Sequence, residues 1–184
     1  MHKSRVKTWA HLSLVSAYLI FGVNFNIAKA VMPEHIKPLV LVMFRSVLTA
    51  ALFWLTSLFM PKEPVNRKDL LFLFGASFFG VVINQTLFIV GLSMTSPINS
   101  SIILSTNPIF AFVFAAFILK ERITILKGSG LGLGLLGVLL LILQNGTPDM
   151  HSSTFIGDVF TLVNTVSWAF YSVIIKRMLE KYHP

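Results

Sequence analysis

Long apolar runs are the feature that most constrains what this chain can fold into. A helix of about 20 apolar residues crosses the roughly 30 Å hydrocarbon core of a bilayer. The chain contains six such runs, and we predict that each forms a membrane-spanning helix: Ala10–Val31, Leu39–Met60, Leu70–Leu92, Pro97–Leu119, Ile125–Leu143 and Phe155–Met178. The predicted fold class is therefore an all-α integral membrane protein.

The composition agrees with a bilayer environment and argues against nucleic-acid binding. Hydrophobic residues make up 55% of the chain and charged residues only 12%, whereas a globular domain carries about 25% charged residues. The net charge is +8, but the basic residues form short clusters between the apolar runs. That pattern is typical of membrane topology and not of a phosphate-binding face. We expect the lipid bilayer, and no nucleic acid, as a partner.

The basic residues also predict the orientation of the chain. Twelve of the 15 lysines and arginines lie in connections that fall on one side of the predicted bundle. By the positive-inside rule this side is cytoplasmic, and both termini then lie in the cytoplasm. The twelve residues are Lys3, Arg5, Lys7, Lys62, Arg67, Lys68, Lys120, Arg122, Lys127, Lys176, Arg177 and Lys181.

Arg45 is a charge inside a predicted spanning helix. It lies six residues after Leu39, about 9 Å into the helix from its outer end. One interpretation is that its side chain extends back to the outer interface. The other is that it faces the bundle and contacts backbone carbonyls, polar side chains or an anionic group of a substrate.

Polar residues at depth mark two further helices. Asn84 begins an Asn-Gln-Thr cluster in the third span, and Asn107 precedes Pro108 in the fourth. Proline removes one helical hydrogen bond, so we expect either a kink filled by a neighbouring Ser or Thr, or a broken helix that lines a cavity. For Asn84, hydrogen bonding between helices and substrate contact both remain open.

Two segments of the chain resemble each other. Phe21–Lys29 aligns with Trp168–Lys176, and the predicted topology gives the two segments opposite orientations, as an inverted repeat requires. The alignment pairs Phe21 with Trp168 and Asn24 with Tyr171. Each pair of positions within a segment is spaced i, i+3 and shares one helix face. We expect these faces to meet near the midplane and to bind substrate, unless the aromatic residues only pack and Asn24 bonds a neighbouring helix.

Three stretches of the sequence resemble the EamA-type branch of the drug/metabolite transporter superfamily. They are the first hairpin with its early arginine, the proline-containing fourth span with the glycine-rich fifth, and the start of the second repeat: Phe21–Ala50, Thr95–Ile142 and Gly157–Pro184. The resemblance implies ten helices in two inverted five-helix repeats around a central cavity. Residues 8–143 would form the first repeat, and residues 155–184 the first helix of a second, truncated one.

The same resemblance implies a secondary transporter of a bacterial cytoplasmic membrane. It would move a small metabolite or drug-like solute by alternating access. The chain ends at Pro184, where this pattern places the seventh helix. We therefore expect the remaining C-terminal helices, or a second subunit, as a partner. The alternative is a membrane subunit or remnant that does not transport and only packs against partner helices.

The sequence offers no recognisable enzyme site. It contains no cysteine, no His-Glu-x-x-His or Gly-x-Ser-x-Gly motif, and only scattered histidines. We therefore expect no metal, no cofactor and no catalytic residue. Asp158 lies at the end of its predicted span, so the middle of the six helices holds no carboxylate for proton coupling. Our candidate substrate-binding residues are Phe21, Asn24, Arg45, Asn84, Asn107, Trp168 and Tyr171.

Overall fold

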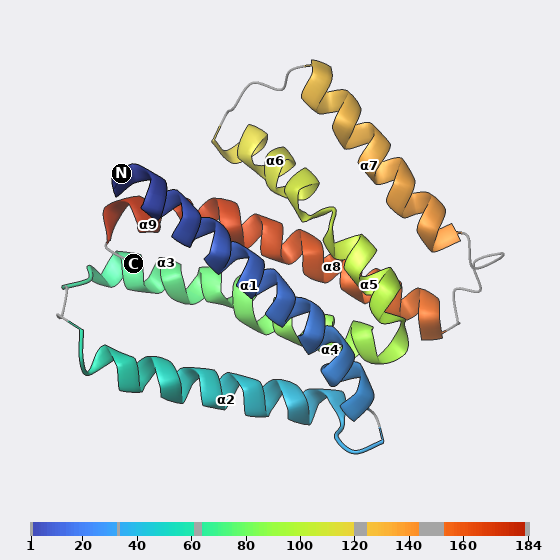
Figure 1. The fold of residues 1–184 in the computed structure, drawn as a ribbon, viewed down its shortest axis with the longest axis horizontal. Helices are drawn as coiled ribbons and strands as arrows, with labels where there is room; N and C mark the ends of the chain where they lie inside the picture. The colour runs from blue at the N-terminus through green and yellow to red at the C-terminus, as the bar shows by residue number, and fades with distance from the viewer. Residues whose placement is uncertain (1, 33, 61–63, 120–124, 144–152, 183–184) are drawn as a thin grey trace.

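The computed structural model describes residues 2–32, 34–60, 64–119, 125–143 and 153–182. The regular structure within these ranges is entirely helical (Figure 1). The elements in chain order are α1 (His2–Val31), α2 (Pro38–Ser57), α3 (Arg67–Ser77), the π-helix η1 (Phe78–Ile83), α4 (Asn84–Met94), α5 (Pro97–Leu104), α6 (Asn107–Ile118), α7 (Ile125–Leu143), α8 (Ser153–Ile174) and α9 (Lys176–Lys181).

Five helical segments of the described chain are long and apolar enough to cross a membrane. They correspond to five of the six predicted spans: His11–Val31, Pro38–Ser57, Arg67–Met94, Pro97–Ile118 and Thr154–Lys181. The sixth prediction is α7, which has the expected bounds Ile125–Leu143. Among the residues whose side chains are described, its apolar stretch is the shorter Gly128–Gly137. The prediction of an all-α membrane protein is confirmed.

The fourth span is interrupted at the predicted proline. The helix stops after Leu104 and restarts at Asn107, with Pro108 in the first turn of α6. At this position proline costs nothing, because its missing N–H would have no partner in the helix. The hydroxyls of Ser105 and Thr106 donate to carbonyl oxygens three residues earlier, each at 2.6 Å. Backbone N–H groups of the same two residues also donate to these carbonyls, so the hydroxyls add further bonds at the break.

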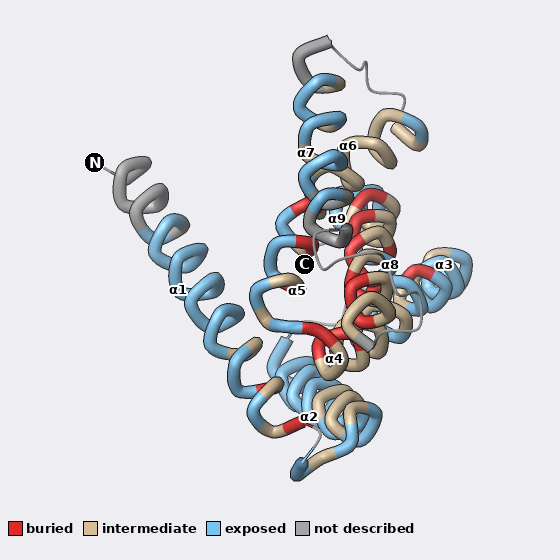
Figure 2. The backbone as a smooth tube through the Cα atoms, turned by 90° about the vertical axis from the view of Figure 1, so that its right-hand side faces the viewer, coloured by how far each residue is buried: buried red, intermediate tan, exposed pale blue. Residues whose placement is uncertain are grey.

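The helix α8 lies at the centre of the packing. Buried positions concentrate on α8 and on the parts of α4 and α5 that face it (Figure 2). Gly91 and Gly157 allow the crossing of α4 and α8, since a Cβ added to either glycine would lie 2.9 Å from the other residue's carbonyl oxygen. Small residues are how membrane helices approach closely. The α2 helix is largely exposed, as a lipid-facing helix would be.

The helices α1 and α2 pack on α4 through a small apolar cluster. Ala28 of α1 and Met32, directly after α1, are buried against Ile89 and Leu92 of α4. Partly buried side chains surround this cluster, namely Phe25, Leu41, Val42 and Phe88. Figure 2 shows that α1 diverges from α8 towards its N-terminus. The packing of α1 is thus confined to the end that leads into α2.

Candidate functional site

A polar stripe runs along the buried face of α8. Asp158, Thr161, Asn164, Thr165 and Ser167 are each at most 7% exposed. Their spacing of three or four residues places them along one side of the helix. Burial of so many polar groups in a membrane helix is costly unless they face other protein groups or water. The stripe therefore marks the side of α8 where a polar site can be built.

Contacts along α8 show which residues of neighbouring helices lie at the same depth in the bundle as the polar stripe. Asn164 Nδ2 donates to the carbonyl oxygen of Asn84 at 2.5 Å, so these residues lie at one level of the bundle. On the other side, Ser100 lies 3.4 Å from Thr161 and Phe114 lies 5.4 Å from Phe170, measured between hydroxyl oxygens and ring centroids respectively.

Asn107 is midway between Ser100 and Phe114. Because α5 and α6 run in the same direction as α8, this places Asn107 at about the depth of Asn164. The break between α5 and α6 therefore falls at the level of the polar stripe.

The helices α1 and α2 bring polar residues to the same depth. The rings of Phe25 and Phe88 are 5.1 Å apart, so Asn84, four residues before Phe88, lies level with Phe21 on the parallel helix α1. Leu41 and Val42 pack against the cluster that contains Ile89 and Leu92. Arg45 follows Leu41 and Val42 in α2, and α2 is antiparallel to α4. Arg45 is therefore level with the residues that precede Ile89 in α4, near Gln85.

Four buried polar atoms at this depth have no hydrogen-bond partner among the described residues. They are Arg45 Nη1, Gln85 Oε1, Asn107 Oδ1 and Asn164 Oδ1. Buried polar groups in proteins are almost always paired, so each unpaired atom requires an explanation. One donor and three acceptors, held on four helices, are suited to a small polar solute. Two of the four residues, Arg45 and Asn107, are among the predicted site residues.

Trp168 and Tyr171 form the aromatic part of the site, one turn farther along α8. Their ring centroids are 5.4 Å apart. The Tyr171 ring covers Gly80 in η1, where an added Cβ would lie 2.6 Å from the ring carbons. Trp168 is 40% exposed and so leaves a face available. A single π-helical turn of this kind often marks a functional position in a membrane helix.

The predicted meeting of the two repeat faces stays a prediction. Phe21 is 60% exposed, and α1 packs on α4 and α5 near its C-terminal end. Asn24 is partly buried one turn away. Phe21 lies level with Asn84 and Asn164, whereas Trp168 and Tyr171 lie one to two turns from that level and Asn24 lies on its other side. Figure 2 also shows α1 diverging from α8 along this part.

Sequence reasoning missed two charged residues at the end of the bundle where α1 is followed by α2 and α4 by α5. Lys29 Nζ donates to the carbonyl oxygens of Leu92, Ser93 and Thr95 at 2.9, 2.8 and 2.7 Å. A cation stabilises the C-terminus of a helix in this way, here that of α4. Asp158 is 1% exposed although it lies near the start of its helix. Its place in the stripe with Thr161 and Thr165 was the available signal.

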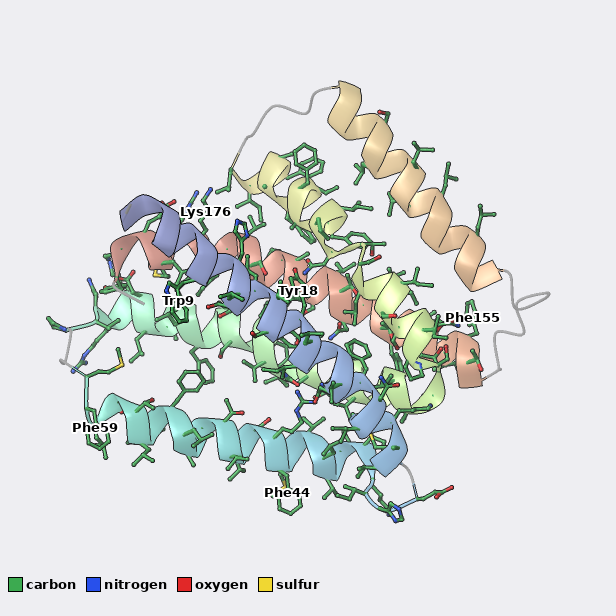
Figure 3. The ribbon with its side chains drawn as sticks, viewed as in Figure 1. Trp9, Tyr18, Phe44, Phe59, Phe155 and Lys176 are labelled. Atoms are coloured by element: carbon green, nitrogen blue, oxygen red, sulfur yellow. The ribbon has the colours of Figure 1, made fainter. Side chains whose placement is uncertain are left out.

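The opposite end of the bundle is held by an ion pair. Lys181 contacts Asp69, and the Tyr182 hydroxyl donates to Asp69 Oδ2 at 2.6 Å. Figure 3 shows Trp9, Phe59 and Lys176 at this end and Phe155 at the other. Within the described ranges, no three His, Asp or Glu side chains gather in a way that could hold a metal ion.

Comparison with known proteins gives a consistent result. Residues 8–143 match the EamA-like transporter family. The uncharacterized transporter YyaM of Bacillus subtilis is 28% identical over 173 residues, 92% of this chain and 56% of the relative. An uncharacterized transporter of Archaeoglobus fulgidus is 26% identical over 179 residues, 97% of this chain and 61% of the relative. The chain thus spans little more than half the length of these relatives. No solved structure matches it.

Proposed function

Because the chain belongs to the EamA-like transporter family, we propose that it is a secondary transporter, or the N-terminal portion of one. It would move a small metabolite or drug-like solute across the membrane by alternating access. The observation that carries this proposal is the set of unpaired buried polar atoms on Arg45, Gln85, Asn107 and Asn164. A helix bundle that only packed against partners would have no use for unpaired polar groups at one depth.

The architecture that we propose is the ten-helix inverted repeat, with both termini in the cytoplasm. Two features support it: the similarity between Phe21–Lys29 and Trp168–Lys176, and relatives more than one and a half times as long as this chain. The remaining helices would come from a C-terminal segment or a second subunit. The relatives are named as transporters, which favours transport over an enzymatic role or a purely structural one.

We propose that the solute binds between the four unpaired polar groups and the aromatic pair Trp168 and Tyr171. Arg45 and the amide oxygens would supply directional contacts, and Trp168 and Tyr171 an aromatic surface. Asn84 and Phe21 lie at the depth of the unpaired polar groups, and Asn24 lies one turn from it. Phe21 and Asn24 would complete the site when α1 moves towards α8. Binding at mid-depth is where inverted-repeat carriers hold their substrates.

Intrinsic fluorescence offers a test of binding. The chain has three tryptophans, and Trp9 and Trp54 are 70% and 77% exposed, on lipid-facing positions. A variant with Trp9→Phe and Trp54→Phe keeps Trp168 as its sole tryptophan. We expect its fluorescence to respond to some members of a panel of small polar and amphipathic solutes, and those solutes to be taken up or released by proteoliposomes.

The matched control keeps Trp9 and Trp54 and replaces Trp168 with Phe. Solutes that change the fluorescence of the first variant should leave the fluorescence of this one unchanged. Asn24→Ala should weaken binding of the same solutes without reducing the amount of folded protein in the membrane. Equal responses in the two tryptophan variants would place the solute elsewhere, and a lack of transport for every solute that binds would favour the non-transporting alternative.

A further inference from the structure

Among the described residues, the contacts of α1 with the rest of the bundle are concentrated at its C-terminal end. Lys29 Nζ donates to three carbonyl oxygens where α4 ends, and Ala28 packs in the apolar cluster beside it. The Phe25 ring contacts Phe88 one turn earlier. Residues 11–23 are all exposed, and Figure 2 shows this part of α1 standing away from α8. The helix is thus anchored near Lys29 and diverges from there.

Tyr18 lies on the side of α1 that the anchor turns towards the bundle. It precedes Phe25 by seven residues and Lys29 by eleven, and positions with these spacings share one side of an α-helix. Its side chain is 74% exposed, and its hydroxyl makes no hydrogen bond to any residue that the structure describes. Figure 3 shows Tyr18 about midway along α1. A phenol at this depth in hydrocarbon would lack the hydrogen-bond partner that tyrosine usually has away from water.

The aromatic pair of α8 lies at the depth of Tyr18. Phe25 contacts Phe88 of the parallel helix α4, and Tyr18 is seven residues before Phe25. Seven residues before Phe88 the chain is in η1, next to the position that the Tyr171 ring covers. Trp168, whose ring centroid is 5.4 Å from that of Tyr171, is 40% exposed. Two exposed aromatic side chains are thus held at one depth, on helices that the divergence of α1 separates.

Rotation of α1 about its anchor would bring these two side chains together. A rigid helix that is fixed near one end moves least beside the anchor and most at its far end. Gly22 lies between Lys29 and Tyr18, and a Cβ added there would meet nothing within 4 Å. This part of α1 therefore has room to approach the bundle. Contact between the rings of Tyr18 and Trp168 would be favourable in either an offset or an edge-on arrangement.

We propose that α1 is a lid that pivots about Lys29 and closes over Trp168, with Tyr18 as the residue that meets the indole ring. In the structure the lid is open towards the end of the bundle that holds the N-terminus. A closed lid would separate a bound solute from that end. This role in alternating access rests on the proposed function, but the closure itself does not. Tyr18 is new to the site, because the similarity between the two repeats begins only at Phe21.

Disulfide trapping tests the closure without any solute, because the chain has no cysteine. The helices α1 and α8 are antiparallel, so Leu14 and Ser172 lie one turn beyond Tyr18 and Trp168 on the same sides of the two helices. We expect Leu14→Cys with Ser172→Cys to form an intramolecular disulfide when membranes are oxidised. The matched control is Ser16→Cys with Ser172→Cys, since Ser16 is on the opposite side of α1. Because a disulfide needs close Cβ atoms, the first pair should react about tenfold faster.

Two further measurements separate the anchor from the covering of Trp168. Lys29→Met should bring the ratio of the two rates close to one, because α1 then no longer keeps one side towards the bundle. Lys37→Met should leave the ratio unchanged. In the variant that keeps Trp168 as its sole tryptophan, the disulfide of the first pair should remove most of the quenching of the indole by acrylamide. Reduction of the disulfide should restore the quenching.

Several results would overturn the proposal. Equal rates for the two cysteine pairs would do so, as would equal quenching before and after reduction. A disulfide that joins two chains would show that a second copy covers this side of α1. If the first pair does not fold, Tyr18→Cys with Trp168→Cys gives the same comparison, and Ile20→Cys with Trp168→Cys is its control. Failure of solute transport with an unchanged rate ratio would affect only the proposed function.

Discussion

Lys29, Lys37 and Arg45 lie apart from the basic clusters at the end of the molecule that holds the N-terminus, and each has a different environment. Lys29 is satisfied by three carbonyl oxygens at the end of α4. Lys37 is exposed at the start of α2 and makes no side-chain capping hydrogen bond. Arg45 is partly buried, with Nη1 unpaired. At the scale of a residue, Lys29 has a structural explanation and Arg45 does not, which favours a ligand for Arg45.

Replacing Arg45 with Lys tests that assignment. Lysine keeps the charge and can also extend to the interface, but it lacks the planar fork that contacts an anion through two nitrogens. We expect Arg45→Lys to insert normally and to lower transport about tenfold, as expected for loss of a charge-assisted hydrogen bond of roughly 1.5 kcal/mol. Uptake rates and membrane levels measure the two effects. Wild-type rates with both Lys and Gln at this position would show that the side chain only reaches the interface.

Lys29 should contribute to stability as well. Lys29→Met leaves three carbonyl oxygens at the end of α4 without their donor, and we expect a loss of roughly 1–3 kcal/mol in the free energy of unfolding. Thermal unfolding in detergent would measure it as a lower midpoint. Lys37→Met is the matched control and should change the midpoint little. Equal midpoints for the two variants would mean that water replaces the ammonium group.

At the scale of an element, the third span shows how one helix is shaped by another. The π-helical turn η1 leaves the carbonyl oxygens of Phe79 and Asn84 to accept from side chains of α8, Ser167 at 2.8 Å and Asn164 at 2.5 Å. Phe79 also packs edge-on against Phe170, with centroids 5.0 Å apart. The irregular turn is thus matched to α8, and the two would move together in any conformational change.

A pair of glycines in the same continuous helix tests this fit. An alanine Cβ at Gly80 would lie 2.6 Å from the Tyr171 ring, whereas at Gly75 it would meet nothing within 4 Å. We expect Gly80→Ala to destabilise by roughly 1–3 kcal/mol, because either the ring or the turn must shift. Gly75→Ala should be neutral or slightly stabilising. Thermal unfolding of both variants measures the difference, and a Gly80→Ala midpoint equal to that of Gly75→Ala would contradict the close fit.

The sequence is informative about the elements and much less so about their contacts. Apolar length alone predicts where the spans lie, and Pro108 predicts the break in the fourth. The π-helical turn has no sequence signature that periodicity would reveal, since Phe78–Ile83 is uniformly apolar. Apolar length places Asp158 at a span end and does not report which side of a helix is covered. Burial arises from the close α4–α8 crossing at Gly91 and Gly157, and that is a tertiary property.

At the scale of the whole molecule, the two ends of the bundle differ in chemistry. One end holds the N-terminus, the start of α3 and the end of α9, where Lys181 and Tyr182 contact Asp69 (Figure 1). The other holds the α4–α5 link with Lys29 and Asp158. The first end carries three of the four basic clusters that the positive-inside rule assigns to the cytoplasm, those at Lys3–Lys7, Arg67–Lys68 and Lys176–Lys181. Alternating access would then open the link end to the outside.

Single cysteines test this orientation, because the chain has none of its own. Ser96 lies in the α4–α5 link and Asn66 caps the start of α3, and both are exposed. In intact cells we expect an impermeant thiol reagent to label Ser96→Cys and to spare Asn66→Cys, whereas a permeant reagent should label both. Ser152→Cys, which lies outside the described residues, should behave as Ser96→Cys does. Labelling of Asn66→Cys by the impermeant reagent would reverse the orientation. The positive-inside assignment would then be wrong for all twelve basic residues.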